Sequence, residues 1–355
     1  MAVFFMLIKK QIIELREHFE KAQNPVFFYD NDVDGLCSFV LLRRYLGRGK
    51  GVAVRSHPDI DVRYAKKAQE LQADYIFVLD RPFLGDAFVQ ELERLNLPIV
   101  WIDHHEVDSK HHRHSQVHVF NPTLHTGEEK SAEPVTYLCY SLTNRKEDLW
   151  FAIMGCISDH YLPDFSSDFV KQYPELWGGT REIREPFDAY YTTEIGMLAR
   201  ALSFGLKDSI THVVYLQNFL IACRSPHDLL EELISNSSFT HTYQDTKKKY
   251  DELLHRAREH VGKKMVYFEY GGTVSMSADL ANELSYLYPK QVIIVAYDKG
   301  LMSNLSLRGK RVRTILELIL PGFEGASGGG HEDAVGARLR TADLERFKEA
   351  FEQQL

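Results

Sequence analysis

Short apolar runs alternate with amphipathic stretches over the first part of the chain, and this alternation constrains the fold more than any other feature. The apolar runs have the length and composition of buried strands, and the amphipathic stretches have helical periodicity. Strands that alternate with helices predict a mostly parallel sheet with helices on both faces. The expected strands are 25–29, 52–55, 75–79 and 98–102, and the expected helices are 38–46, 62–71, 86–95 and 151–157.

The pattern changes in the middle of the chain and changes again near residue 265. From 171 to 264 the strand runs disappear and helical periodicity dominates, which predicts a helical connector. Strands are then expected at 265–270, 291–297 and 302–307, with helices at 278–287, 314–320 and 342–353. We therefore predict an α/β protein with a parallel-sheet domain over 1–170, a helical connector over 171–264 and a smaller α/β domain over 265–355.

Length and composition fit an intracellular protein of two domains. The 355 residues exceed what one hydrophobic core usually supports. The apolar start is followed by Lys9 and Lys10 without a small-residue cleavage site, and every apolar run is too short to cross a membrane. The four cysteines are scattered without metal-ligand or redox spacing, which predicts free thiols and a cytoplasmic location with no membrane partner.

Several predicted strands end in a carboxylate. Asp30 and Asp32 follow the first strand, Asp80 follows the third, and Asp103 and His104 follow the fourth. Because ligands of an open parallel sheet bind outside the carboxyl ends of its strands, we expect these side chains to converge. One such aspartate is more often a helix cap or turn residue. Their occurrence at successive strand ends favours a shared site.

Clustered carboxylates repel each other and stay ionised only when cations lie between them. Carboxylates with imidazole suit manganese, iron or zinc, and the excess of carboxylates favours manganese or magnesium. Two such ions bridged by one carboxylate can hold a phosphate and generate hydroxide. Asp159 directly follows the apolar helix 151–157, so its side chain could reach the same ions.

The order of these residues resembles the DHH superfamily of phosphoesterases, and RecJ-like members in particular. The segment 30–35 reads DNDVDG, which is similar to the DxDxDG motif of that family. Asp80 and Asp159 stand where two further motif aspartates belong, and residues 103–105 are the triplet Asp-His-His. Near the other end, residues 328–331 resemble the GGGH motif of the DHH-associated C-terminal domain.

The resemblance implies a two-domain clamp with a site for two manganese ions in the cleft. Asp30 and Asp80 would bind one ion, and Asp80 would bridge to a second ion. That second ion would also be bound by Asp32, His104 and Asp159. Asp103 would support the site, and His105 would contact the scissile phosphate. Four residues of the C-terminal domain would hold the phosphate or sugar of the substrate: Arg308, Gly329, Gly330 and His331.

One position departs from the family pattern. Many members carry a histidine ligand shortly before the first aspartate, but residues 26–29 read VFFY here. Water, Asp34 or another histidine could complete the first ion site. The segment 104–118 is rich in histidine and lacks cysteine, which predicts a loop beside the cleft. Its six histidines are His104, His105, His111, His112, His114 and His118.

The C-terminal part offers two further signals. Glycines 328–330 suit a loop in front of a helix, where backbone N–H groups bind an anion. The run 307–313 carries four cations in a chain of net charge −8, so nucleic acid would have to be held locally by such a patch. The alternative for each is an ordinary hinge loop and a solvated charged surface.

Three functions follow as hypotheses. The first is an exonuclease on single-stranded DNA or RNA, acting in repair by in-line attack of a metal-bound hydroxide. The second is a small-substrate phosphoesterase acting on very short oligoribonucleotides, cyclic dinucleotides or phosphoadenosine phosphate. The third is a non-catalytic scaffold that binds replication or repair proteins. The connector helices could also form a homo-oligomer interface.

Overall fold

The computed structural model describes residue 7 and residues 9–56, 59–105, 116–124, 133–178 and 182–355. The chain forms two compact units, Met1–Tyr243 and Gln244–Leu355. The boundary falls within the long helix α13 (Ser238–Arg258). The predicted loop histidines His111, His112 and His114 lie outside the described residues.

The first unit contains a five-stranded sheet in which every described pairing is parallel, and its strand order is β2-β1-β3-β4-β5. The strands are β1 (Pro25–Asp30), β2 (Lys50–Val54), β3 (Tyr75–Leu79), β4 (Ile99–Ile102) and β5 (Val117–Phe120). The first four confirm the sequence prediction. The fifth strand falls in the segment that we expected to be a loop, so that expectation was wrong for His118.

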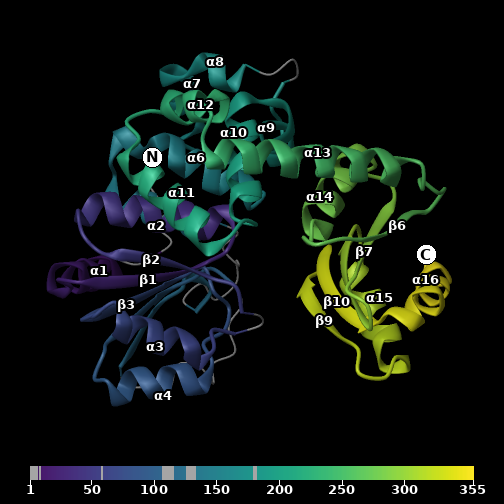
Figure 1. Ribbon diagram of the computed structural model, residues 1–355, viewed down its shortest axis with the longest axis horizontal. Helices are drawn as coiled ribbons and strands as arrows, with labels where there is room; N and C mark the ends of the chain where they lie inside the picture. The colour runs from purple at the N-terminus through teal and green to yellow at the C-terminus, as the bar shows by residue number, and fades with distance from the viewer. Residues whose placement is uncertain (1–6, 8, 57–58, 106–115, 125–132, 179–181) are drawn as a thin grey trace. The chain divides into compact units, whose positions relative to one another are not determined.

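Helices cover both faces of this sheet (Figure 1). Helices α3 (Val62–Glu70) and α4 (Asp86–Arg94) cover one face, where Phe28, Phe88 and Trp101 are buried. The other face is covered by α1 (Lys9–Lys21), α2 (Val33–Leu46), α5 (Val135–Thr143) and α6 (Leu149–Ser158). Because both faces are covered, the central strands are continuous apolar runs.

Six more helices extend the second of these layers. They bury their apolar sides against the core that α2 and α6 share, so they are part of the first unit. They are α7 (Ser166–Gln172), α8 (Pro174–Trp177), α9 (Pro186–Thr192), α10 (Glu194–Gly205), α11 (Ile210–Ala222) and α12 (Pro226–Ile234). No described helix is both long enough and apolar enough to cross a lipid bilayer.

The second unit contains a mixed five-stranded sheet of order β6-β7-β8-β10-β9. Its first two strands pair in parallel and the others pair antiparallel. The strands are β6 (Met265–Gly271), β7 (Val292–Asp298), β8 (Met302–Arg308), β9 (Ser327–His331) and β10 (Ala334–Arg340). Helices α15 (Val312–Ile319) and α16 (Leu344–Glu352) pack on one face, and α14 (Ser277–Leu287) contacts β7 and β8.

The glycine-rich segment is a strand in this structure, so the predicted phosphate loop in front of a helix was wrong. Strand β9 pairs with β10 in a hairpin, and no helix follows it directly. A Cβ atom on Gly328 would lie 2.9 Å from the carbonyl oxygen of Gly336 and from Leu316 Cδ2. Gly328 therefore lets the edge strand β9 pack closely against β10 and α15. It does not belong to the N-terminus of a helix.

Candidate metal centre

Five acidic or imidazole side chains gather at the carboxyl edge of the first sheet. Asp30 is the last residue of β1, Asp80 directly follows β3, and His104 follows β4 after one residue. Asp32 caps α2, and Asp159 is the C-cap of α6. Ligand atoms of Asp30, Asp32 and Asp80 lie within 4.8 Å of one another, as do those of Asp34, His104 and Asp159. The structure thus brings together the residues predicted as metal ligands.

Gly35 explains how Asp30 and Asp32 come to lie together. The Asp32 carboxylate accepts a hydrogen bond of 2.9 Å from the Gly35 N–H and so begins α2. A Cβ atom on Gly35 would lie 2.5 Å from the carbonyl oxygen of Asp30. Only glycine lets the first turn of α2 approach the end of β1 this closely, which accounts for the glycine that closes the motif.

Asp34 lies in the same turn but points away from Asp30. Its side chain is buried and accepts hydrogen bonds from the backbone N–H groups of Val135 and Thr136, at 2.9 and 2.7 Å. These two residues begin α5, so Asp34 fixes that helix against α2. Its carboxylate remains close to His104 and Asp159.

Asp80 lies at the centre of the cluster. Its φ of 59° is in the left-handed region, where aspartate is more common than most residues, and it turns the chain sharply after β3. Its buried Oδ1 atom lies 3.4 Å from His104 Nε2 and accepts no hydrogen bond from any residue that the structure describes. A buried carboxylate oxygen without a donor is costly, and a divalent cation would satisfy it.

The pKa values show that the cluster holds protons when no cation is present. Burial, followed by the charge of Asp80, raises the pKa of Asp34 well above the usual range, and the charges of Asp80 and Asp30 raise the pKa of the more exposed Asp32. Burial raises the pKa of Asp159 to about 6, although the charge of His104 opposes it. Burial acts to lower the pKa of His104, but its close contact with the Asp80 carboxylate and the charge of Asp159 raise it well above the ordinary value.

His105 is held by Asp103 and Asn121. Its Nδ1 atom lies 2.9 Å from Asp103 Oδ1, and the Asn121 amide donates to Asp103 Oδ2 at 3.3 Å and to the His105 carbonyl at 2.9 Å. Burial acts to lower the pKa of His105, but the hydrogen bond to Asp103 outweighs burial and raises the pKa to about 9. Asp103 therefore orients the imidazole and favours its protonated form. Sequence reasoning missed Asn121, which follows the unpredicted strand β5.

Arg81 is the other residue that sequence reasoning missed. Its side chain is buried, with Nη1 2.5 Å from Asp30 Oδ1 and Nη2 3.0 Å from the carbonyl oxygen of Ser56. The indole of Trp101 donates to the Arg81 carbonyl at 2.8 Å. A cation therefore already stands beside Asp30. The only signal in the sequence was an arginine directly after Asp80.

The clustered donors fit a divalent cation. His104 Nε2 lies 3.4 Å from the buried Asp80 Oδ1 atom and 3.6 Å from Asp159 Oδ2, so these three side chains offer nitrogen and oxygen donors close together. The group of Asp30, Asp32 and Asp80 also offers three carboxylates, but Arg81 already offsets the charge of Asp30.

The predicted substrate residues lie on one sheet of the second unit. Arg308 on β8, Ala334 on β10 and His331 on β9 are opposite one another in register, so their side chains face the same side of the sheet. Gly329 and Gly336 form the next pair on this face. A Cβ atom on Gly329 would meet no described atom within 4 Å, so the two glycines leave open backbone beside Arg308 and His331. Gly330 pairs with Val335 and belongs to the opposite face.

The basic run 307–313 is less available for binding a nucleic-acid backbone than its sequence indicates. Arg308 Nε donates to Asn282 at 2.6 Å, and Arg313 forms an ion pair of 2.8 Å with Glu317. Lys310 and Arg311 are exposed. Two of the four cations thus have internal partners.

Two family models match the chain. The N-terminal domain of the DHH family matches residues 26–158, and the DHHA1 domain matches residues 262–355. Together they cover more than half of the sequence. A search of curated proteins finds no match.

Solved structures of low sequence identity share the fold. RecJ from Thermus thermophilus in complex with Mn²⁺ is similar over 100% of this chain and 55% of its own, with 14% identity and a TM-score of 0.67. An exonuclease RecJ bound to manganese is matched over 95% of its length, and this chain over 100%, with 14% identity and a TM-score of 0.62. A pGpG-specific phosphodiesterase from Vibrio matches 94% of this chain and 98% of its own, with 12% identity and a TM-score of 0.50. This chain thus spans about half the length of the Thermus protein.

Proposed function

Since the chain belongs to the DHH superfamily of phosphoesterases, we propose that it is a metal-dependent phosphodiesterase that removes nucleotides from one end of single-stranded DNA or RNA. The observation that carries this proposal is the buried Asp80 Oδ1 atom, which faces His104 without a hydrogen-bond donor among the described residues. Such an atom at the end of a parallel strand suits a cation that binds a phosphate.

In this proposal, Asp80, His104 and Asp159 hold the ion, and Asp32 faces the same region from the start of α2. Manganese or magnesium bound here would offset the charge of the phosphate oxygens and lower the pKa of an attacking water. The carboxylates give up protons when the ion binds, because their pKa values are raised in its absence.

His105 contacts the scissile phosphate in this account. Its raised pKa keeps it protonated, so its imidazolium can donate a hydrogen bond to a phosphate oxygen and stabilise charge that develops there. Asp103 orients the ring through Nδ1, and Asn121 holds Asp103 in turn. Asp103 is therefore a positioning residue.

We further propose that the site uses one ion, although the sequence favours two. The Arg81 guanidinium contacts Asp30 on the side of the first ion and supplies a permanent positive charge there. An arginine cannot lower the pKa of water as a metal does, but it can neutralise a carboxylate and bind a phosphate oxygen.

The open backbone over Gly329 and Gly336 is the proposed contact for the sugar or phosphate of the substrate. Arg308 and His331 flank it on the same face of the sheet. Arg308 is held by Asn282, so its guanidinium is oriented before the substrate binds. Gly330 belongs to the opposite face of the sheet, so only its backbone atoms could take part in this contact.

A second candidate is a phosphoesterase for very short oligonucleotides. It is favoured by the small number of exposed cations in the basic run, since a long strand needs several phosphate contacts. The pGpG-specific phosphodiesterase has a similar fold, which is compatible with this candidate.

The test uses end-labelled single strands of DNA and RNA, from dimers to long strands, with manganese and with EDTA. The Asp80→Asn variant serves as the inactive control. Manganese-dependent cleavage of long strands that requires Asp80 would support the exonuclease, and a steep preference for dimers to pentamers would support the second candidate. Inertness toward every length would refute both and favour a scaffold.

A further inference from the structure

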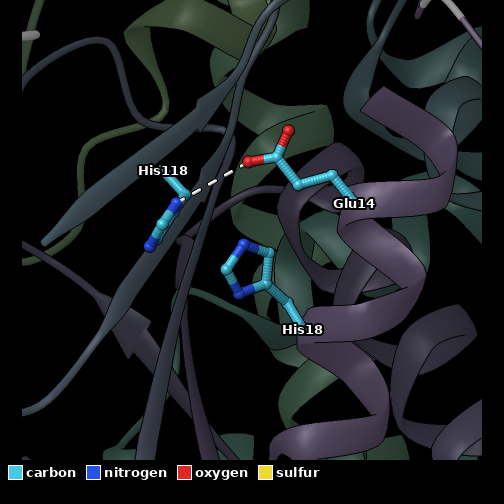
Figure 2. A group of neighbouring side chains, drawn as sticks. All are labelled: Glu14, His18 and His118. Carbon is cyan, nitrogen blue, oxygen red and sulfur yellow. Dashed lines mark ion pairs between the residues drawn. The ribbon is translucent and has the colours of Figure 1, made fainter. Parts of the chain in front are cut away.

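A second cluster of metal-binding side chains lies away from the candidate metal centre. Glu14 and His18 are four residues apart, so they share one face of α1. His118 belongs to β5, the edge strand of the first sheet. Figure 2 shows the three side chains pointing toward one another.

The distances suit one small cation. His118 Nδ1 lies 3.8 Å from Glu14 Oε1, the ring centroids of His18 and His118 are 4.2 Å apart, and one ligand atom from each residue lies within 4.8 Å of the others. Neighbouring ligands of tetrahedral zinc are about 3.3 Å apart, given Zn–N distances of about 2.0 Å. Since Glu14 and His118 are partly exposed, small rotations of their side chains would close this difference.

Tyr75 gives His18 the arrangement expected of a ligand. The buried His18 ring has its Nδ1 atom 2.5 Å from the Tyr75 hydroxyl. This contact fixes the ring, and an Nδ1–H group that donates to the Tyr75 oxygen leaves the Nε2 lone pair for a ligand, as in metal-bound histidines. Burial, with the neighbouring His118, lowers the pKa of His18 to about 4, so the ring is neutral and able to bind a metal at neutral pH.

The cluster is distinct from the centre around Asp80. Tyr75 is the first residue of β3, whereas Asp80 directly follows its last residue. Five strand residues span roughly 16 Å. His118 is in register with Val100 and Phe77, in the middle of β4 and β3, so both clusters share the sheet but the first lies short of the carboxyl ends where Asp80 stands.

We propose that Glu14, His18 and His118 bind a zinc ion that fastens α1 to β5. Two imidazoles and one carboxylate are a ligand set for zinc, whereas manganese and magnesium prefer more oxygen atoms. Coordination of the ion by His118 would also stabilise the end of β5. There the Phe120 carbonyl accepts a hydrogen bond from the Asp103 N–H at 3.2 Å, and Asn121 holds Asp103. Three protein ligands leave the fourth position of the ion to water, and the proposal does not depend on the proposed nuclease activity.

The experiment measures zinc in the full chain after treatment with EDTA, addition of zinc and desalting. Every protein in this experiment carries the Asp80→Asn substitution, so that the candidate metal centre around Asp80 binds less of the added zinc. We expect one zinc per chain, and Co²⁺ in its place should give the visible absorption of a low-coordinate site. Glu14→Gln and His118→Gln should each weaken zinc binding more than about 100-fold, and Tyr75→Phe about tenfold.

Glu17→Gln is the matched control, because Glu17 lies on the same helix and pairs only weakly with Lys21 at 3.8 Å. It should bind zinc as the parent does. Circular dichroism without zinc checks that every variant is folded. Equal zinc content in the parent, Glu14→Gln and His118→Gln proteins would overturn the proposal, as would the absence of zinc from the parent.

Discussion

The guanidinium of Arg81 lies 2.5 Å from the carboxylate of Asp30, the aspartate that no histidine precedes in residues 26–29. The two residues are 51 positions apart in sequence. Their contact places a fixed positive charge beside the first aspartate of the motif. Arg81 therefore offsets the charge of Asp30 in a chain that has no histidine at residues 26–29.

Replacing Arg81 should change the number of ions bound. We expect the parent to bind one manganese ion per chain in the Glu14→Gln background, and Arg81→Ala to bind two, because Asp30, Asp32 and Asp80 then lack an internal cation. Metal analysis after equilibrium dialysis gives the stoichiometry, and the electron paramagnetic resonance spectrum distinguishes isolated from coupled Mn²⁺. Arg63→Ala is the control, since Arg63 is an exposed arginine paired with Asp61. Two coupled ions in the parent would refute the one-ion site.

Manganese affinity should rise with pH between about 5 and 7. The pKa of Asp159 is raised to about 6, so below that value a proton competes with the cation for the carboxylate. The raised pKa values of Asp32 and His104 act in the same direction. Calorimetry in buffers of different ionisation enthalpy should show net proton release on binding at pH 7. An affinity that is constant over this range, with no proton release, would contradict the arrangement of the cluster.

Gly35→Ala should destabilise the first unit by about 2–3 kcal/mol, the typical cost of an overpacked contact. The new methyl group would meet the backbone of Asp30 at 2.5 Å, and backbone cannot move aside as a side chain can. Urea unfolding measures the loss. Gly271→Ala is the control, because a Cβ atom there meets no described atom within 4 Å. Equal stability of the two variants would show that α2 does not need this close approach.

His105→Gln should lower kcat roughly 100-fold with little change in KM, if the imidazolium acts mainly on the developing charge. Asn121→Ala should have a smaller effect in the same direction, since it removes only a support of Asp103. Steady-state kinetics on one labelled oligonucleotide distinguishes the two parameters. A rise in KM alone would assign His105 to substrate binding instead of catalysis.

The central strands and the carboxylates at their ends were predictable, because a strand buried on both faces is an apolar run whose end is visible in the sequence. Strand β5 was not, since it is a short edge strand with His118 in a polar neighbourhood. Strand β9 is mostly glycine, and only its pairing with β10 makes it a strand.

Contacts between distant residues limited the prediction of the site. The ligand candidates could be named because each follows a strand or helix end. The Arg81–Asp30 ion pair and the support from Asn121 depend on how those ends meet in space. The cluster of Glu14, His18 and His118 likewise joins a helix to a strand about 100 residues away.

The most direct test of the account is the cleavage of labelled single strands by the parent and the Asp80→Asn variant, each with manganese and with EDTA. We predict cleavage by the parent in manganese only, and a loss of roughly 1000-fold or more in the variant, equivalent to about 4 kcal/mol of transition-state stabilisation. Cleavage that persists in EDTA, or that the variant retains, would contradict a metal-dependent reaction centred on Asp80.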